Sequence, residues 1–579
     1  MKKTAITLSL AAFAVALQAS ASGKWTLQGV EYAVDTLSHY RVGPGTTVTI
    51  VDLAGPVKQR VFYTVTDLSH PDVEIKTICG KDELRSNLTV PDMVAQHADH
   101  DNVYFAGVNS DLFSATGPIG STVVDGEVYK TAKTSTAWRA AGYDSDGAVY
   151  FGTAQAYFSA RLNGKGGCSP DYVNVPRVQG ESIVYTRRWG KTTGTESGET
   201  GVEVAMKPLG GGLDAGGYTE YEVLSAPEVN KGNMSIPEGG IVLSSAKSSQ
   251  FDMLKAAKAG DVFRLGTSFN IKGQGYGVEH YCTGLREMSG GNPLLLEKGV
   301  ILDTDDALDH LKSRRPRTAL GCDATGRRMV MLVVDGDKLN SGISAGCASK
   351  DLAAMMLATG CTEAVNFDGG GSSTLYTERF GVLNRPSDGS LRRVRNGWFV
   401  TTPNTGDNEV AEIAFADPVK RINPGETYTP VIYGYNKAGL LVDTNVKGVV
   451  LSCAPALGSV SSDGASLKVG GKGLFRLEAK SGAMTASIAV YAGDWQSGIT
   501  DVAPDADAHC LLSNHVRAGS NAVLSLAAPA GVAVYALSGH MMLSRRYDAA
   551  GSVELPTAAL PCGVYIVRAG AQTMKLIIR

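Results

Sequence analysis

The chain has 579 residues, of which 43% are apolar and 19% are charged, and its formal net charge at pH 7 is −3. A chain of this length exceeds a single hydrophobic core, so we expect roughly two to four domains, and the composition excludes a disordered protein. The small net charge and the lack of a basic block in the sequence exclude nucleic acid as the expected partner.

The first 21 residues have the features of a secretory signal peptide. Lys2 and Lys3 precede an apolar run over Ala5–Leu17, and the small residues Ala19–Ala21 offer a cleavage site. No later apolar run is long enough to span a bilayer. We therefore expect a mature protein without a transmembrane segment, secreted or held at the cell surface after passing through the periplasm.

The nine cysteines in the sequence do not indicate a metal site. None of them forms a Cys-x-x-Cys pair or a cluster with histidine, which structural zinc would need. An odd number in an exported protein leaves at least one thiol unpaired. Cys347 and Cys361 flank one predicted helix, where two buried thiols fit better than a disulfide.

The first part of the mature chain is predicted to consist mainly of strands. Apolar and polar residues alternate in runs such as Thr47–Val51 and Val61–Val65, which is the period of a half-buried strand. A helix is expected over Ser86–His97, followed by a strand over Asn102–Asn109. This strand ends in a polar turn through Asp111. A ligand-binding role for Asn109 or Asp111 and a purely structural turn both fit these residues.

A hairpin and a helix are predicted before the most informative stretch of the sequence. Arg317 precedes the hairpin, whose arms are Thr318–Cys322 and Arg328–Val334, and the second arm leads into Asp335. An amphipathic helix is expected over Ser344–Thr359, with glycine just past its end, where helices commonly terminate.

The most informative stretch is 364–400. A short apolar strand, Ala364–Phe367, breaks on Asp368 and Gly369–Gly371, and two serines follow. Glycines let main-chain amides approach a ligand closely, so a carboxylate, free amides and hydroxyls are presented at one point. Such a corner suits an anionic or polyhydroxyl ligand.

A second polar turn, Asn384–Ser390, follows and carries Arg385, and three more arginines come after it at Arg392, Arg393 and Arg395. A guanidinium group grips phosphate or carboxylate through two parallel hydrogen bonds. The two turns together therefore favour an anion-binding site.

These two runs, NFDGGGSST and NRPSDGSLRRVRN, closely resemble the signature of the phosphodiester glycosidase family, which includes N-acetylglucosamine-1-phosphodiester alpha-N-acetylglucosaminidase. Arg317-Thr318 and the loop Gly290–Leu296 are similar to family segments at the same places, and Gly290-Gly291 is expected to form a tight turn. The segment around Asn109 matches only loosely. The resemblance covers approximately residues 100–400 and is strongest over 290–400.

The resemblance implies an exported enzyme that hydrolyses the bond between a sugar's anomeric carbon and phosphate in a sugar-1-phosphodiester, such as one of N-acetylglucosamine. The enzyme domain is expected over residues 22–402, of α+β class with mixed β-sheets and few helices. Asp368 would be the nucleophile or the base that activates water, and Arg317 and Arg385 would hold the phosphate.

Other residues of the implied site have less defined roles. Asp335, Asp351 and Asp388 are weaker candidates for a second carboxylate. No motif demands a cofactor or a metal, and a divalent cation on Asp368 stays open. The residues expected to bind the phosphodiester-linked glycan substrate are Asn109, Gly291, Thr318, Asp335, Asn366, Gly369, Gly370, Gly371, Ser372, Ser373, Asn384 and Asp388.

Two further modules are expected after the enzyme domain. Residues 403–505 carry short alternating strands, such as Leu474–Ala479, and resemble a bacterial immunoglobulin-like β-sandwich. Residues 506–579 resemble the C-terminal sorting domain of the type IX secretion system, on the pattern over Leu560–Arg568 and the terminal position. That resemblance implies the type IX secretion machinery as a partner.

Two other functions stay open at the level of the sequence. A non-catalytic cell-surface protein that binds glycans fits the β-rich tail modules. A hydrolase that acts on the phosphorus side of the diester would release a phosphorylated sugar in place of a free one. The sequence does not fix the sugar, the group attached to its phosphate, or whether cleavage retains or inverts configuration.

Overall fold

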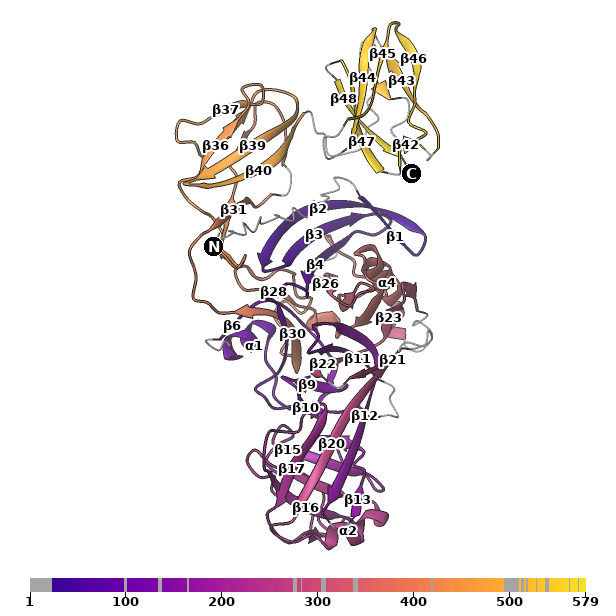
Figure 1. Ribbon diagram of the computed structural model, residues 1–579, viewed down its shortest axis with the longest axis vertical. Helices are drawn as coiled ribbons and strands as arrows, with labels where there is room; N and C mark the ends of the chain where they lie inside the picture. Colours follow the sequence, from indigo (N-terminus) through magenta and orange to yellow (C-terminus); the bar gives the residue numbers. More distant parts are fainter. Residues whose placement is uncertain are drawn as a thin grey trace, which may run out of the picture. The chain divides into compact units, whose positions relative to one another are not determined.

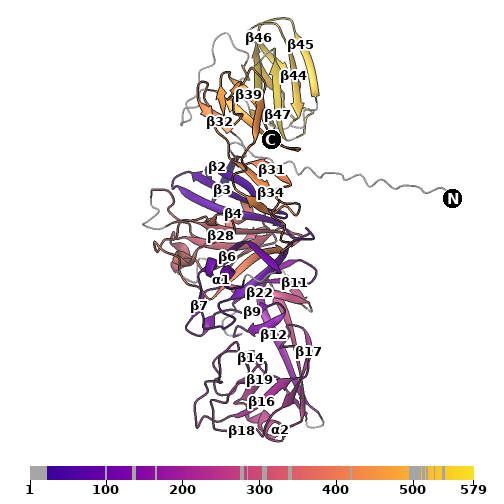
Figure 2. The same cartoon turned by 90° about the vertical axis from the view of Figure 1, so that its left-hand side faces the viewer.

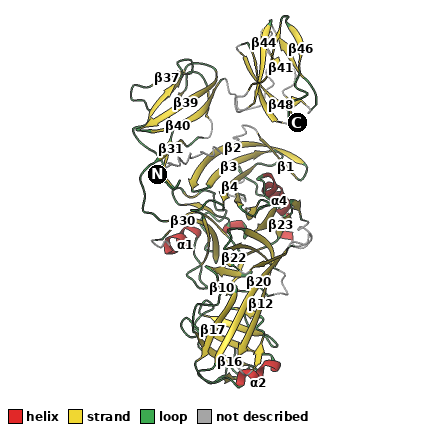
Figure 3. Cartoon of the chain, viewed as in Figure 1, coloured by secondary structure: helices red, strands yellow, loops and turns green. Residues whose placement is uncertain are grey.

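The computed structural model describes residues 23–97, 101–133, 138–163, 166–273, 279–282, 284–302, 309–336, 342–417, 420–493, 510–511, 515–516, 519–526, 528–536, 541–561, 563–570 and 572–578. The chain forms two compact units, Met1–Asp494 and Trp495–Arg579. Strands dominate and helices are few, which confirms the predicted β-rich class (Figure 3). No helix in the described ranges is long and apolar enough to cross a bilayer. The expected signal peptide lies outside the described residues.

The predicted hairpin lies in the middle of an antiparallel sheet. Its arms are β25 (Arg317–Cys322) and β26 (Arg328–Val334), and β25 also pairs with β27 (Glu363–Asn366). The spatial order is β1 (Gly23–Leu27), β2 (Val30–Gly43), β3 (Thr46–Ala54), β4 (Gln59–Asp67), β26, β25, β27, β23 (Leu294–Glu297) and β24 (Val300–Ile301).

Both faces of this sheet are buried. On β26, Val330 and Leu332 pack into the core that contains α4 (Ser349–Ala358), whereas Met329 and Met331 point to the opposite face. That opposite face packs on a second sheet, in the spatial order β29 (Gly381–Val382), β28 (Leu375–Thr377), β6 (Asn102–Asn109), β30 (Asn396–Pro403) and β5 (Glu74–Cys79). Side chains alternate between the faces of a strand, so one near-continuous apolar run serves two cores.

A third, long sheet extends from this region to an end that also carries the short helix α2 (Phe251–Lys255) (Figures 1 and 2). Its strands β12 and β20 pair over ten residue pairs, from Thr153↔Lys272 to Leu162↔Phe263. The spatial order is β10 (Glu127–Lys130), β9 (Thr122–Val124), β22 (Leu285–Gly291), β11 (Arg139–Asp144), β12 (Val149–Leu162), β20 (Val262–Lys272), β17 (Gly217–Val223), β16 (Val202–Pro208), β19 (Ile241–Ser245), β15 (Ser182–Thr186) and β14 (Tyr172–Val173). Strand β21 (Glu279–Cys282) also pairs with β20.

Two helices begin later than the sequence predicts. The helix expected over Ser86–His97 is α1 (Val90–His97), because Leu88 is held in a β-bridge with Val394. The helix expected over Ser344–Thr359 begins at Ser349, because Cys347 bridges Arg315. Tertiary pairing therefore overrides helix propensity at both starts.

The glycines of the Gly290–Leu296 loop do not form the predicted tight turn. Gly290 and Gly291 are the last residues of β22, where they pair with Ala140 and Arg139 of β11. The chain continues into β23 through a cis peptide bond between Asn292 and Pro293, and the N–H of Asn292 donates to the carbonyl of Asn366 at 2.8 Å.

The residues after 403 are all-β within the described ranges. The residues Tyr428–Tyr433 look like one strand in the sequence but are split between β33 (Thr427–Tyr428) and β34 (Ile432–Tyr435), because Pro430 has no N–H to give to a ladder. The other strands of Met1–Asp494 here are β31 (Glu412–Phe415), β32 (Lys420–Ile422), β35 (Leu441–Asp443), β36 (Val450–Cys453), β37 (Gly458–Val460), β38 (Leu467–Val469), β39 (Gly473–Ser481) and β40 (Met484–Ala492).

The second unit has its own core, which includes Leu524, Val532, Val567 and Leu576. Its strands are β41 (Cys510–Leu511), β42 (His515–Val516), β43 (Ala522–Leu526), β44 (Ala530–Ala536), β45 (Met541–Tyr547), β46 (Gly551–Leu555), β47 (Gly563–Ala569) and β48 (Gln572–Ile578).

Candidate active site

The predicted glycine corner lies where the two packed sheets meet. The corner follows β27, and the N–H of Asp368 donates to the carbonyl of Ser110, just past the end of β6, at 2.7 Å. The N–H of Gly370 donates to the carbonyl of Pro316, just before β25, at 2.9 Å. The corner is therefore held from both sides by residues distant in sequence.

Asn109 joins the same three segments through its side chain. Its Nδ2 donates to the carbonyl of Asp368 at 2.7 Å, and its Oδ1 accepts from the hydroxyl of Thr318 and the N–H of Thr374, both at 3.0 Å. Asn109 and Thr318 are fully buried. The observed contacts give both residues a positioning role, and direct contact with a substrate stays a prediction.

Asp368 is half-buried at this corner, and Gly369 and Gly370 beside it are also partly open to solvent. Burial raises the pKa of the Asp368 carboxyl to about 6, and three nearby groups limit the rise. These are the hydroxyl of Ser372, the positive charge of Arg392 and the N–H of Gly369. Asp368 is therefore ionised at neutral pH and keeps the basicity that a nucleophile or general base needs.

A second carboxyl group, Asp111, lies close enough to the corner for the charge of Asp368 to act on it. Its Oδ2 accepts from the N–H of Gly120 at 2.6 Å and its Oδ1 from the indole N–H of Trp138 at 2.9 Å. Burial raises the pKa of Asp111 to about 7, and the negative charge of Asp368 adds to the rise. A Cβ at Gly290 would run into this carboxyl group, so only glycine fits there.

The sequence left a role for Asp111 open and placed the second carboxylate elsewhere. Asp335 is buried, burial raises its pKa to about 6, and it accepts from the N–H of Arg385 at 3.1 Å. Asp351 forms an ion pair with Arg314 at 3.4 Å. Among the described carboxyl groups, Asp111 is the one whose pKa the charge of Asp368 raises.

The arginine that acts electrostatically on Asp368 is Arg392. Its Nε and Nη2 donate to the carboxylate of Asp388 at 2.8 and 2.7 Å, and its Nη1 donates to the hydroxyl of Ser372 at 3.4 Å. A Cβ at Gly371 would collide with the Asp388 carboxylate, which lies directly over this glycine. Asp388 thus orients Arg392 toward the corner.

The two arginines that the sequence singled out lie in different surroundings. Arg317 is buried, and its guanidinium group donates to the carbonyls of Cys347 at 3.2 Å and Ser313 at 2.9 Å. Its Cδ would lie 3.6 Å from a Cβ built on Gly369, so the side chain borders the corner. Arg385 is exposed, and its N–H is held by Asp335. Phosphate binding by either guanidinium stays a prediction.

The remaining predicted residues surround the corner. The side-chain NH2 of Asn384 donates to the carbonyl of Ser373 at 3.0 Å and to Asp335 at 3.3 Å. That of Asn366 donates to the carbonyl of Asn292 at 2.8 Å. A Cβ at Gly291 would lie 2.8 Å from the carbonyl of Asn366, so this glycine permits close packing.

Three buried polar atoms near the corner have no hydrogen-bond partner among the described residues: Ser110 Oγ, Ser373 Oγ and Asn366 Oδ1. Buried polar groups are normally paired, and an unpaired one costs about 1–3 kcal/mol. All three atoms belong to segments that form the corner, because Ser110 accepts the N–H of Asp368 and the other two residues flank the glycines.

Other residue patterns in the chain prove structural. The run Gly342–Gly346 has the Gly-x-Ser-x-Gly spacing of serine hydrolases. Its Ser344 is buried, however, and its hydroxyl donates to the carbonyl of Asp335 and accepts from the N–H of Arg60. Cys347 and Cys361 are buried free thiols, as predicted. The described residues contain no cluster of three or more His, Cys, Asp or Glu that could hold a metal ion.

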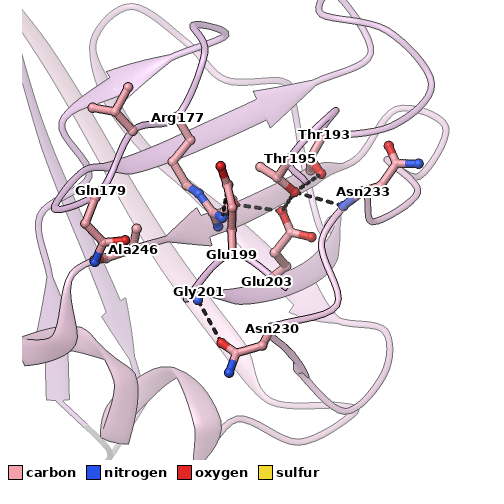
Figure 4. Close-up of polar contacts among 12 residues, drawn as sticks. Arg177, Gln179, Thr193, Thr195, Glu199, Gly201, Glu203, Asn230, Asn233 and Ala246 are labelled. Carbon is pink, nitrogen blue, oxygen red and sulfur yellow. Dashed lines mark hydrogen bonds and ion pairs between the residues drawn. The ribbon is translucent and has the colours of Figure 1, made fainter. Parts of the chain in front are cut away.

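A second buried polar cluster lies around β16 and β19 of the third sheet, away from the corner that carries Asp368 (Figure 4). Arg177 donates to the hydroxyl of Ser244 at 2.8 Å and to Glu199 at 3.1 Å. One oxygen of Glu203 accepts from Thr195 and Ser244, and the other accepts from a backbone N–H at 3.1 Å. Each charged group in this cluster is engaged, which is the pattern of a structural network.

The fold and the corner together define a β-rich protein in which a partly open carboxylate, Asp368, lies beside Ser372 and Arg392, an arrangement suited to general acid–base or nucleophilic chemistry. Residues 213–401 match the model of the phosphodiester glycosidase family. The matched segment contains Asp368, the three glycines and Arg392, but not Asn109 or Asp111.

Solved structures share parts of this fold at low identity. A hypothetical protein from Synechocystis is 16% identical with a TM-score of 0.48, and 62% of each chain is covered. A Burkholderia pseudomallei protein is 15% identical with a TM-score of 0.48, covering 65% of this chain and 99% of that one. The catalytic domain of zebrafish N-acetylglucosamine-1-phosphodiester alpha-N-acetylglucosaminidase is 12% identical with a TM-score of 0.32, covering 64% and 87%. No curated protein matches the sequence.

Proposed function

We propose that this protein is a glycosidase that cleaves the bond between a sugar's anomeric carbon and phosphate in a sugar-1-phosphodiester, with N-acetylglucosamine-1-phosphodiesters as the first substrates to test. The observation that carries the proposal is the corner itself, where the partly open Asp368 carboxylate lies beside the Ser372 hydroxyl and the positive charge of Arg392. The family match over 213–401 supports the same reaction class.

In the proposed reaction, ionised Asp368 either attacks the anomeric carbon, forming a glycosyl ester that water then hydrolyses, or removes a proton from the water that attacks this carbon. The bond from that carbon to the phosphate oxygen breaks, and the phosphate monoester leaves with the bonding electron pair. Arg392 stabilises the negative charge that develops on the phosphate, because it lies beside Asp368 and Ser372 and is held in place by Asp388.

Asp111 supplies the complementary proton. Because its pKa lies near 7, it is protonated over part of the range in which Asp368 is ionised. It donates its proton to the departing phosphate oxygen and recovers one from water. A phosphate monoester leaves well without much protonation, so we expect Asp111 to contribute less to the rate than Asp368.

The test is turnover of the methyl phosphodiester of N-acetylglucosamine-1-phosphate by the mature protein. The proposal expects free N-acetylglucosamine and methyl phosphate, and near-complete loss of both products in Asp368→Asn. Asp463→Asn is the matched control, because Asp463 lies in a surface turn and its contacts to Ser461 and Ala465 can be kept by an amide. N-acetylglucosamine-1-phosphate and methanol as products would assign the protein to the phosphorus-side reaction.

We also propose that the chain is exported, and that residues 506–579 address it to the type IX secretion machinery. The support is the signal-like residues 1–21 and the terminal Leu-Pro-x-Gly-Val-Tyr pattern in the sequence. Expression with and without residues 506–579 in a bacterium with this system tests the address. Surface delivery of both forms would contradict it.

A further inference from the structure

The exposed aromatic side chains of the described residues gather on one sheet. They are Tyr157, Tyr218 and Tyr281, which are 45%, 63% and 74% exposed. They lie on β12, β17 and β21, three strands that all pair with β20. Every other described aromatic residue is buried or partly buried, so this grouping is a specific feature of the surface.

The strand register places the three rings on the same face. Tyr157 lies opposite Ser268, Tyr218 opposite Gly266 and Tyr281 opposite Asn270. Directly opposite residues point to the same side of a sheet, and so do alternate residues of one strand. The rings therefore flank β20 in three successive rows, with about 7 Å between rows from the rise of a strand.

The three tyrosine rings are not part of the hydrophobic core on which β20 packs. On the other face of β20, Phe263, Leu265 and Phe269 fill the core, whereas the residues that face out with the tyrosines are polar or glycine. Those residues are Arg264, Gly266 and Ser268, and Asn270, the next residue on this side of the strand, is buried. Large aromatic side chains are normally buried for their apolar area, so three exposed ones on a single polar face indicate a ligand.

Gly266 allows the ring of Tyr218 to lie close against the backbone of β20. A Cβ there would lie 2.6 Å from a ring carbon of Tyr218 and 2.8 Å from the hydroxyl of Ser159. The guanidinium carbon of Arg264 lies 4.2 Å from the centre of the same ring. A cation over the ring fixes its orientation and adds hydrogen-bond donors at its edge.

This tyrosine face continues the face on which the candidate active site rests. Phe151 lies on the same side of β12 as Tyr157, and it is buried in the core that contains Leu320 and Val365 of the site-bearing sheet. The rows that carry the exposed tyrosines begin beyond the part of this face that is buried in that core. From the strand spacing and rise, Tyr157 lies roughly 16 Å from Gly291, which borders Asn366 beside the corner.

We propose that the face formed by β12, β20, β17 and β21 binds a glycan chain through Tyr157, Tyr218 and Tyr281. Flat aromatic rings stack on the C–H faces of sugar rings, and the interleaved Ser159, Ser268 and Arg264 side chains match sugar hydroxyls. The row spacing lets successive rings contact successive sugar units. This binding goes beyond the proposed hydrolysis and does not require it.

The test is affinity gel electrophoresis with glycol chitin, mannan, dextran or arabinoxylan in the gel. The protein carries Asp368→Asn, so that cleavage of a probe does not affect the result and failure of the proposed reaction leaves the test intact. We expect retardation by at least one polysaccharide, and a loss of affinity of about tenfold or more in Tyr218→Ala and in the triple Tyr157→Ala/Tyr218→Ala/Tyr281→Ala variant.

Leu474→Ala is the control, because Leu474 is also strongly exposed but lies on β39. Circular dichroism checks that each variant is folded, and Tyr157→Phe/Tyr218→Phe/Tyr281→Phe keeps the rings if the alanine variant does not fold. Equal retardation of wild type and folded alanine variants, or no retardation by any polysaccharide, would overturn the proposal. Self-association in sedimentation that the tyrosine variants abolish would assign the face to a second copy of the chain instead.

Discussion

Two buried polar clusters of the same compact unit differ in one respect. Around Arg177 and Glu203, each charged group has its hydrogen-bond partners within the protein. Around Asp368, two carboxyl groups have raised pKa values and buried Ser110 and Ser373 hydroxyls lack partners. Folding tends to satisfy polar groups, so the cluster left incomplete is the one adapted to a ligand.

The largest expected effect is on catalysis at the incomplete cluster. Asp368→Asn removes the ionisable oxygen while keeping the shape, so we expect kcat to fall by about 1,000-fold or more. The melting temperature should stay the same or rise, because the buried charge is also removed. Turnover and thermal unfolding of the same preparation check this. Near-wild-type kcat would remove Asp368 from the mechanism.

A change in the cluster around Arg177 and Glu203 should lower stability and leave catalysis unchanged. Arg177→Met leaves the buried Glu203 network without its cation, so we expect a loss of about 3 kcal/mol in the free energy of unfolding. The kcat/KM of the folded fraction should not change. Urea unfolding with parallel activity measurements tests this, and a selective loss of kcat in a stable Arg177→Met protein would show that the two clusters are not distinct.

Asp111 provides a pH test of the carboxyl pair. With Asp368 ionising near pH 6 and Asp111 losing its proton near pH 7, kcat/KM should peak between these values. Asp111→Asn should lower kcat by about 100-fold and remove the alkaline limb of the profile. An unchanged alkaline limb in that variant would assign the limb to another group.

The same carboxyl groups should make stability depend on pH. A carboxyl whose folded pKa is raised binds more protons when folded, so stability falls as pH rises from the ordinary pKa to the folded one. For buried Asp335 the window runs from about pH 4 to about pH 6. We expect Asp335→Asn to remove on the order of 2 kcal/mol of this decline. Unfolding curves at pH 4.5 and 7.0 test it, and parallel pH slopes for both proteins would contradict it.

Local sequence patterns predicted much of the fold. The strand Asn102–Asn109 has the predicted bounds, and the hairpin of β25 and β26 differs by one residue. These elements are short apolar runs bounded by turn residues, which is a local signal. The helix starts at Val90 and Ser349 depend on bridges to distant residues, which no local pattern contains.

The sequence predicted the centre of the site but not the residues whose charges act on it or that its charge acts on. Asp368 and its glycines form one contiguous motif, whereas Asp111 reaches the corner only through the pairing of segments far apart in the sequence. Four arginines stand close together in and just after the second turn, and nothing local distinguishes Arg392 from Arg385. The spacing of Asp388 and Arg392 was the one available signal, since a carboxylate four residues before an arginine can orient it.

The central claim, that this corner cleaves the bond at the anomeric carbon, is tested most directly by hydrolysis of a sugar-1-phosphodiester in oxygen-18 water. Mass spectrometry of the products locates the new oxygen. The account predicts the heavy oxygen in the released sugar and none in the phosphate monoester. Label in the phosphate would contradict it, because water would then have attacked phosphorus.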